Sequence, residues 1–196
     1  MIEHTEISLL GKDDIIKYLK CFDYELNKLL NKRKVKSWFM FDIYIFGGAA
    51  ILLSTDARRL TQDIDVFYIE DSCLEEAAVK VAERFGLDRK WINTSIKTSK
   101  SYSNELLKFC EPCFTELNLH RCRLYKAPLS LLLCMKLIAF RTDERTHDVE
   151  DIETVIKTLE NLNIKVNADF IYSEFDRYFL SRDKIGDNAR SFIESR

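Results

Sequence analysis

The sequence predicts an α/β fold, in which a small mixed sheet is flanked by helices and followed by a helical C-terminal part. Short β-branched and aromatic runs, such as residues 43–46 and 63–68, alternate with longer segments of helical periodicity. From residue 128 onward the pattern is helical or mixed. We therefore expect a core over residues 1–127 and a helical part over 128–196, packed together as one compact unit.

Composition supports a single folded chain. The 196 residues are 46% hydrophobic, which is enough for one domain with a sizeable core. Only 5 Gly and 2 Pro argue against disorder or long linkers. The formal net charge of -2 gives no general attraction to nucleic acid, so any such contact must come from a local patch. Without an apolar leader or a run of 18 apolar residues, we expect a soluble, cytoplasmic protein that contacts no membrane.

The first element is an amphipathic helix over residues 13–31, whose apolar positions recur at helical spacing. A basic cluster overlaps its end and continues beyond it. This cluster consists of Lys28, Lys32, Arg33, Lys34 and Lys36. Cations at a helix end suit the helix dipole, and cations in a patch also bind an RNA phosphate backbone. The sequence leaves both interpretations open.

The central stretch reads as strand, glycine turn, short helix, loop and strand. Gly47 and Gly48 follow the strand at residues 43–46 and allow a tight turn into a helix, whose N-terminal amides can bind phosphate. Asp63 and Asp65 are two residues apart in the next strand, so both carboxylates lie on one face. Such a pair repels itself unless a cation is bound, and oxygen ligands beside a phosphate site favour Mg²⁺.

The loop between these elements is polar and basic. Arg58 and Arg59 carry guanidinium groups that match phosphate oxygens, and Thr61 follows them. One interpretation is that this loop holds the triphosphate of a nucleotide. The other is that each Arg is simply solvated at the surface.

A second amphipathic helix is expected over residues 73–85, with Gly86 as its C-cap. Trp91 beyond it is an ordinary core residue or, alternatively, a surface on which a base stacks. Residues 114–120 alternate in polarity and predict a strand that places Glu116 opposite Leu117 and Leu119.

The cysteines raise the possibility of a zinc site. Cys110 and Cys113 form half of such a site, and His120 with Cys122 could supply the rest. However, Cys113 and Cys122 fall in apolar or strand-like stretches, where a free thiol packs as a small hydrophobe. We therefore expect core thiols, and no disulfide framework in a chain without a signal peptide.

The C-terminal part begins with an apolar helix over residues 128–140, opened by proline. Lys136 lies inside it, where a cation must reach water along the helix surface or meet an anion. A further helix is expected over residues 147–162. Asp148 and Asp151 share one face near its N-terminus, a placement that helix capping alone explains.

The glycine pair Gly47-Gly48 followed by Asp63-Ile64-Asp65 resembles the signature of the nucleotidyltransferase superfamily. Within it, the chain most resembles the toxin-like nucleotidyltransferases of abortive-infection and type IV toxin–antitoxin systems and their uncharacterised relatives. Two further stretches support this narrower match, residues 91–93 and the Lys136 helix that leads to Arg141, Asp148 and Asp151. The resemblance covers roughly the middle three-quarters of the chain.

The resemblance implies a nucleotidyltransferase fold and Mg²⁺-dependent transfer of NMP from NTP to an acceptor hydroxyl. In the toxin-like relatives the acceptor is often RNA, tRNA in particular, and a cognate antitoxin is a further possible partner. The resemblance implies catalytic roles for Asp63, Asp65, Lys136 and Asp148. Nucleotide contacts are expected from Gly47, Gly48, Arg58, Arg59, Thr61 and Arg141.

The third acidic group has two candidates. Glu116, in the expected later strand, would add a metal ligand to Asp63 and Asp65. Asp148 is the competitor, because its position resembles an active-site acid of the toxin-like relatives. Those relatives often carry Arg just before it, whereas this chain has His147.

Two other functions are compatible with the sequence. One is a nucleotidyltransferase that modifies a small hydroxylated molecule, such as an antibiotic. The other is a non-catalytic relative that binds a nucleotide or a partner protein. Intact Asp63 and Asp65 argue against the non-catalytic relative, and the basic cluster favours RNA over a small acceptor.

Overall fold

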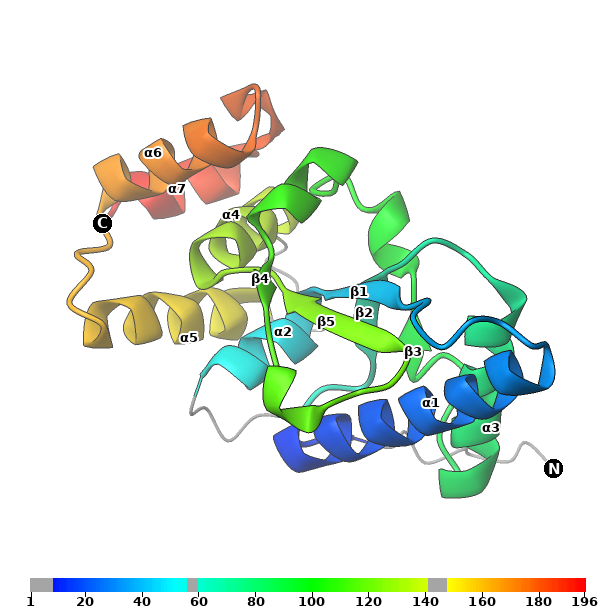
Figure 1. Ribbon diagram of the computed structural model, residues 1–196. Coiled ribbons are helices and arrows are strands. Elements are labelled where there is room, and N and C mark those ends of the chain that lie inside the picture. The colour runs from blue at the N-terminus through cyan, green and yellow to red at the C-terminus, as the bar shows by residue number, and fades with distance from the viewer. Residues whose placement is uncertain (1–8, 56–59, 141–147) are drawn as a thin grey trace, which may run out of the picture.

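The computed structural model describes residues 9–55, 60–140 and 148–196 (Figure 1). It confirms the α/β class. The helices are α1 (Lys12–Lys32), α2 (Gly47–Ser54), α3 (Ser72–Phe85), α4 (Leu129–Ala139), α5 (Asp148–Asn161), α6 (Ala168–Tyr178) and α7 (Asp187–Glu194). The strands are β1 (Phe41–Ile45), β2 (Ile64–Phe67), β3 (Ile92–Asn93), β4 (Glu111–Pro112) and β5 (Cys122–Lys126). Short 3₁₀ helices are η1 (Ser95–Thr98), η2 (Asn104–Phe109), η3 (Thr115–Leu117) and η4 (Arg182–Lys184).

The strands form one mixed sheet in the order β3-β2-β1-β5-β4. β1 lies at its centre, parallel to β5 and antiparallel to β2. β3 runs parallel to β2, and β4 runs antiparallel to β5. Just beyond β1, the backbone N–H of Phe46 donates to the carbonyl of Asp65 at 2.9 Å. The carboxyl end of β1 therefore lies beside Asp65 in β2.

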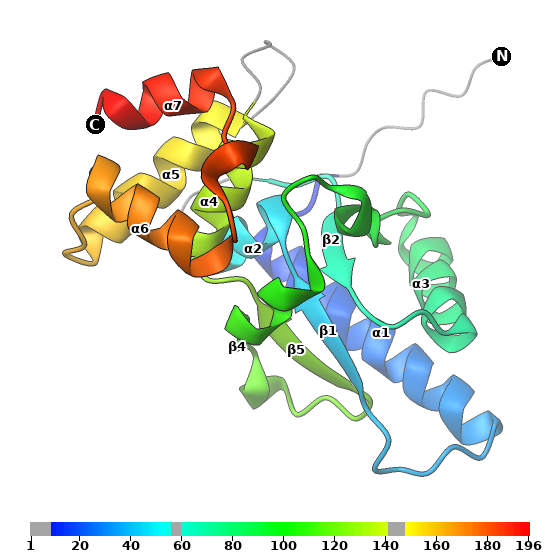
Figure 2. The same ribbon diagram turned by 90° about the horizontal axis from the view of Figure 1, so that it is seen from above.

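One face of the sheet carries the main core. Every second residue of β1, from Phe41 to Ile45, is buried, as are Ile64 and Val66 of β2. Helices α1 and α3 lie side by side over this face (Figures 1 and 2). Trp91 is fully buried, and its indole N–H donates to the carbonyl of Ala78 at 3.0 Å. Trp91 is thus a core residue, and the base-stacking interpretation is wrong.

The helical predictions hold. Helices α1 (Lys12–Lys32), α3 (Ser72–Phe85), α4 (Leu129–Ala139) and α5 (Asp148–Asn161) occur where helices were expected. Gly86 ends α3 in the left-handed region, with φ of 65°, as a C-cap glycine does. Helices α4 to α7 gather at the end of the sheet where β1 leads into α2 (Figure 2). The division at residue 127 into core and helical part stays a prediction.

The strand expected over residues 114–120 does not form. Residues 115–117 make the 3₁₀ helix η3, and Phe114 and Asn118 on either side have φ of 55° and 48°. Left-handed backbone cannot continue a strand. The strand before this segment, β4, pairs with β5 but is only 2 residues long, and its Pro112 has no N–H to donate to a ladder. Glu116 is exposed on this turn.

All 6 cysteines are free. Within the described ranges, no three His, Cys, Asp or Glu side chains are grouped so that they could hold a metal ion, so the zinc site is not formed there. Burial raises the pKa of Cys110 to about 12 and that of Cys113 to about 11, which suits packing thiols. No helix of the described part is both long enough and apolar enough to cross a membrane.

Candidate active site

The turn from β1 into α2 is built around the Asp65 carboxylate. Gly47 has φ of +61°, and a Cβ atom there would lie 2.5 Å from the Asp65 Oδ2. Both the backbone conformation and the space therefore require glycine. Gly48 follows it, and a Cβ there would lie 3.1 Å from the Thr61 hydroxyl. The glycine pair thus lets the start of α2 approach the strand that carries the acidic residues.

Asp63 and Asp65 lie on the same side of β2, as period-two geometry predicts. Asp65 alternates with buried Ile64 and Val66, and Asp63 immediately precedes the strand. The Asp63 Oδ2 accepts a hydrogen bond from Asn93 Nδ2 at 2.9 Å. Asn93 is itself oriented, because its Oδ1 accepts from the backbone N–H of Ser95 at 2.9 Å. Asn93 on β3 is therefore a positioning residue for Asp63.

Within the described residues, the negative charges of Asp63 and Asp65 are only partly compensated. Burial and the charge of Asp63 raise the pKa of Asp65 to about 6, against the opposing effect of Lys136. Burial also raises the pKa of Asp63, although the hydrogen bond from Asn93 opposes the rise. A raised carboxyl pKa means that the anion is destabilised where it stands. A cation bound between the two carboxylates would relieve that destabilisation.

Across from this pair, Lys136 of α4 is held by two acids of α5. Its Nζ lies 3.0 Å from Asp148 Oδ1 and 2.7 Å from Asp151 Oδ2. Both carboxylates are buried, whereas the Lys136 side chain keeps 21% of its surface exposed. Burial alone would lower the pKa of Lys136, but the two acids outweigh it and raise the pKa above its ordinary value. Lys136 is therefore a fixed cation.

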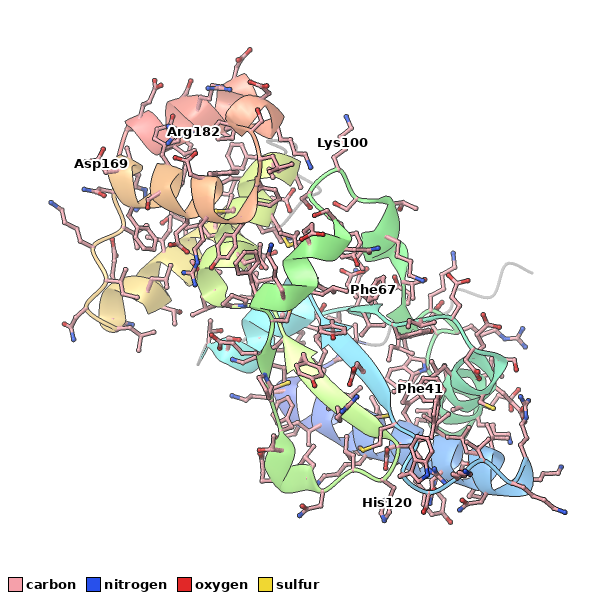
Figure 3. All side chains as sticks on the ribbon, turned by 45° about the horizontal axis from the view of Figure 1, so that its top comes forward. Phe41, Phe67, Lys100, His120, Asp169 and Arg182 are labelled. Carbon is pink, nitrogen blue, oxygen red and sulfur yellow. The ribbon has the colours of Figure 1, made fainter. Side chains whose placement is uncertain are left out.

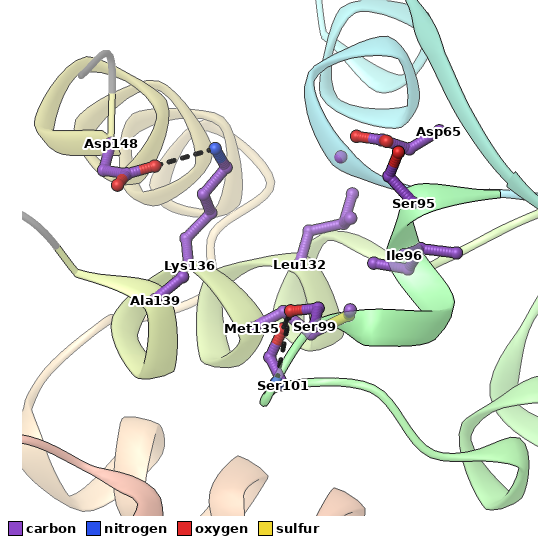
Figure 4. Close-up of a pocket in the computed structure, with 11 residues that line it drawn as sticks. Asp65, Ser95, Ile96, Ser99, Ser101, Leu132, Met135, Lys136, Ala139 and Asp148 are labelled. Atoms are coloured by element: carbon purple, nitrogen blue, oxygen red, sulfur yellow. Dashed lines mark hydrogen bonds and ion pairs between the residues drawn. The ribbon is translucent and has the colours of Figure 1, made fainter. Parts of the chain in front are cut away.

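These groups line one cavity of about 420 Å³ (Figure 4). Asp65 lies on one side, and Lys136 with Asp148 lies on the other. Gly47, which also lines the cavity, packs against Asp65. Asp63 precedes Asp65 on the same strand face, outside the cavity lining. The structure thus brings together the glycine turn, the acidic strand and the Lys136 helix, which are far apart in the sequence.

The cavity also has a serine wall that the sequence analysis missed. Ser95, Ser99 and Ser101 line it together with Ile96. The Ser99 and Ser101 hydroxyl oxygens are 2.7 Å apart (Figure 4). These residues follow β3, whose last residue, Asn93, pairs with Asp65, so the chain leaves β3 beside Asp65. The polar run of residues 93–101 was the only signal for this wall.

Glu116 does not join the carboxylate pair. β4 pairs Glu111 with Lys126 at the carboxyl end of β5, and the chain then runs back along β5 toward its amino end. β5 is parallel to β1, so η3 lies toward the end of the sheet opposite Asp65. The prediction of Glu116 as a metal ligand depended on a strand that does not form.

Of the remaining predicted site residues, the structure describes only Thr61. The Thr61 hydroxyl donates to the carbonyl of Asp63 at 3.1 Å, so Thr61 supports the turn that leads into β2. Arg58, Arg59 and Arg141 lie outside the described residues, and their expected contacts with nucleotide phosphates stay predictions.

The arrangement has the elements needed to bind a nucleoside triphosphate beside a divalent cation. The first amides of α2 can bind a phosphate, because the first bond within the helix is donated by Ala50 N to the carbonyl of Phe46. Two carboxylates on one side can hold a cation, and Lys136 on the other can bind an anionic oxygen. The serine hydroxyls add neutral donors and acceptors between them.

Comparison with known families gives one match. Residues 17–181 match the model of a family described as a nucleotidyltransferase of unknown function, DUF6036. The comparisons with curated proteins and with solved structures returned no match. The match includes the glycine turn, the acidic strand and the helices that hold Lys136 and Asp148. The chain therefore belongs to this nucleotidyltransferase family.

Proposed function

We propose that the protein is a Mg²⁺-dependent nucleotidyltransferase that moves NMP from an NTP to a hydroxyl of an RNA acceptor. The observation that carries this proposal is the packing of Gly47 against Asp65. A glycine with positive φ brings the phosphate-binding start of α2 within contact distance of a carboxylate whose pKa is raised to about 6. Phosphate and carboxylate are both anionic, so this closeness is useful only if a cation joins them.

The donor set suits Mg²⁺. Asp63 and Asp65 would supply one or two carboxylate ligands, and Mg²⁺ typically completes its coordination with water and substrate phosphates. When bound, the ion would neutralise charge that develops on the phosphoryl group and on the leaving pyrophosphate. Asn93 fixes the orientation of the Asp63 carboxylate through the 2.9 Å hydrogen bond.

The transfer itself is a substitution at the α-phosphorus. The acceptor oxygen forms a bond to that phosphorus, the bond to the oxygen that bridges to the β-phosphate breaks, and pyrophosphate leaves. We assign the proton of the attacking hydroxyl to a carboxylate of the Asp63–Asp65 pair. Lys136 holds an anionic oxygen of the nucleotide, and Asp148 and Asp151 keep its ammonium in place.

Two observations support RNA as the acceptor. The chain resembles toxin-like nucleotidyltransferases, whose acceptor is often tRNA and which can have an antitoxin partner. The basic residues at and beyond the end of α1 are also exposed to solvent, as a phosphate-binding patch requires. These residues are Lys28, Lys32, Arg33, Lys34 and Lys36. A cognate antitoxin remains part of the proposal through the resemblance alone.

A labelling experiment tests the proposal. The purified protein is incubated with each α-labelled NTP, Mg²⁺ and total RNA, and the labelled species is identified. We expect label in RNA with one preferred NTP, and none with Asp65→Asn or with a chelator. Label in a small molecule from a metabolite extract would identify the small-acceptor alternative. Absence of transfer to either pool, with nucleotide binding retained, would favour a non-catalytic relative.

A further inference from the structure

The most exposed tryptophan lies far from the catalytic cavity. Trp38, in the loop between α1 and β1, keeps 73% of its surface accessible, and Tyr24 on α1 keeps 55%. A tryptophan loses more by exposure to water than almost any other side chain, because it has a large apolar surface. The other tryptophan, Trp91, is only 1% exposed. Trp38 is therefore not part of the core.

The loop that presents Trp38 is held rigidly. Residues 36–39 form a turn in which Phe39 N donates to the carbonyl of Lys36 at 3.1 Å. Arg121, itself only 2% exposed, donates from Nη1 to the carbonyls of Lys36 and Phe39, at 2.7 and 3.3 Å. A buried cation thus fixes both ends of the turn, and Trp38 lies at its tip.

Arg121 also joins this turn to the exposed side of α1. Its Nε donates to Asn27 Oδ1 at 2.7 Å, and its Nη2 donates to Asn31 Oδ1 at 2.6 Å. Tyr24 lies on the same half of α1, one turn from Asn27 and two turns from Asn31. The two exposed rings therefore belong to neighbouring segments that one side chain holds together.

A lysine ammonium lies over each of the two rings. Lys36 Nζ lies 5.8 Å from the Trp38 ring centroid, and Lys28 Nζ lies 5.3 Å from that of Tyr24. Lys32 and Lys34, also exposed, add to the positive charge. The acidic side chains near these lysines already have partners.

Glu25 pairs with Lys28, Glu76 pairs with Arg33, and buried Asp23 is used by backbone amides. Within the described part of the chain, Lys32, Lys34 and Lys36 make no ion pair. The surface thus combines two exposed rings with four lysines, of which Lys28 alone is ion-paired within the described ranges.

We propose that Trp38 and Tyr24, with Lys28, Lys32, Lys34 and Lys36, form a docking surface for a single-stranded segment of nucleic acid. Bases stack on the two rings and phosphates contact the lysines, the combination on which sequence-tolerant single-strand binding depends. We call these residues the Trp38 surface. The inference rests on the proposed function for the identity of the polymer as the acceptor RNA.

The position of this surface indicates a polymer. β1 has 5 residues, which span roughly 16 Å at 3.3 Å per residue, and it separates the Trp38 loop from Gly47. Figure 3 shows Phe41 and His120 at one end of the sheet and Phe67 nearer the other. A small acceptor must place its hydroxyl within about 3.5 Å of the phosphorus and cannot also reach Trp38. An RNA chain is long enough to contact both places.

Intrinsic fluorescence provides the test, since Trp38 and Trp91 are the chain's 2 tryptophans and only Trp38 is exposed. A single-stranded 12-nucleotide RNA, added without NTP or Mg²⁺, should quench the Trp38 emission. Trp38→Phe should remove the quenching, and Trp38→Ala should weaken RNA binding about tenfold, the scale of one lost base stack. Lys34→Ala and Lys36→Ala should each lower the salt slope of binding by about 0.7.

Matched variants complete the design. Ile69→Ala removes an apolar side chain that is 80% exposed and lies outside the Trp38 surface, and Lys165→Ala removes an exposed lysine between α5 and α6. Both variants should bind RNA as wild type does.

Unchanged emission on RNA addition, or equal binding by wild type and Trp38→Ala, would overturn the proposal even if nucleotidyl transfer is observed. Emission changes that depend on protein concentration alone would instead assign this surface to a second copy of the chain. Quenching without any transfer would retain the docking surface and count against the proposed reaction.

Discussion

Two carboxylates at opposite ends of the sheet have opposite surroundings. Asp23 of α1 is buried and accepts three backbone N–H groups, from His120, Arg121 and Cys122, at 2.7 to 3.0 Å. Asp65 of β2 accepts no side-chain or amide hydrogen bond at its carboxylate within the part of the chain that the structure describes. Its pKa is raised to about 6.

This difference separates a structural acid from a candidate functional one. The Asp23 carboxylate accepts hydrogen bonds from the three backbone N–H groups that lead into β5. Its charge therefore stabilises the fold. Asp65 loses hydration and gains no hydrogen-bond donor from the described residues, so its charge costs stability in the free protein. A group kept at such a cost and placed against Gly47 is a candidate for binding a cation together with a ligand. The predictions below test that contrast, in order of expected effect.

The largest effect is expected on transfer activity from Asp65→Asn. The amide keeps the size of the side chain and removes the charge that would hold the metal. We expect nucleotidyl transfer to fall by about 10³-fold, the upper range for loss of one electrostatic group. Asp63→Asn should act similarly. The measurement is the initial rate of label transfer at saturating Mg²⁺.

Stability measured in parallel serves as the control. Asp65→Asn should have an unfolding midpoint equal to or above that of wild type at pH 7.5, since the destabilised anion is gone. A variant that lost activity because it unfolded would have an unfolding midpoint below that of wild type. Equal transfer rates for wild type and both variants would refute the catalytic assignment.

Asp23→Ala should affect stability rather than chemistry. The substitution leaves the N–H groups of residues 120–122 without their acceptor, at a cost of about 1 kcal/mol or more each. We expect a loss of about 3 kcal/mol in unfolding free energy, or roughly 6–12 °C in the midpoint for a chain of this size. Thermal or urea unfolding measures it.

Asp23→Asn is the matched control, because it keeps one carbonyl oxygen as an acceptor. Its stability should lie between those of wild type and Asp23→Ala. The folded variants should also keep their transfer rate. A large drop in rate at a temperature where the protein is fully folded would mean that Asp23 is not merely structural.

The local half of this architecture was predictable from the sequence. The spacing of Asp63 and Asp65 places both on one face, and Gly47-Gly48 after a β-branched run marks the turn. Amphipathic periodicity located α1 and α3. Each inference uses residues close together in the chain, where a period of 2 or 3.6 fixes which side chains share a face.

The tertiary half was not predictable from local patterns, although the family resemblance did group Lys136 and Asp148 with Asp63 and Asp65. No local sequence pattern predicts that Asp23 contacts residue 121, or that Lys136 contacts Asp151, because those contacts depend on how the helices pack on the sheet. For Glu116, the local pattern itself gave a wrong prediction. Its alternating neighbourhood suggested a strand, but left-handed Phe114 and Asn118 decided the backbone.

Lys136→Ala gives the next largest expected effect. Removal of the cation that faces Asp65 should lower transfer by about 10²-fold, the scale of one lost electrostatic or acid–base group. It also removes the ammonium that lies between the buried carboxylates of Asp148 and Asp151, so stability should fall too. Rates are therefore compared at a temperature where the variant is folded.

Asp148→Ala separates the two roles that were left open for this acid. If Asp148 positions Lys136 for the reaction, transfer should fall by about 10²-fold and the salt dependence of NTP binding should change. If Asp148 acts only as a helix-end acid, the loss should be limited to about 1 kcal/mol of stability. Kinetics and thermal unfolding of the same preparation distinguish these outcomes.

The smallest effect expected is a pH-dependent difference in stability between wild type and Asp65→Asn. The pKa of Asp65 is about 6 in the folded protein and 3.8 in its ordinary state, so the folded state binds the proton more tightly. The stabilising contribution of protonated Asp65 is complete below pH 3.8 and is lost as pH rises through 6. Wild type should therefore lose roughly 1–2 kcal/mol relative to Asp65→Asn between pH 4 and 7.5, after a discount for partial exposure. Urea unfolding of both proteins in chelator measures the difference. Mg²⁺ added at pH 7.5 should restore part of the wild-type stability and leave Asp65→Asn unchanged, because a ligand stabilises only the state that binds it. A difference that stays constant from pH 4 to 7.5 would show that Asp65 is as well compensated as Asp23, and the contrast between the two ends of the sheet would then fail.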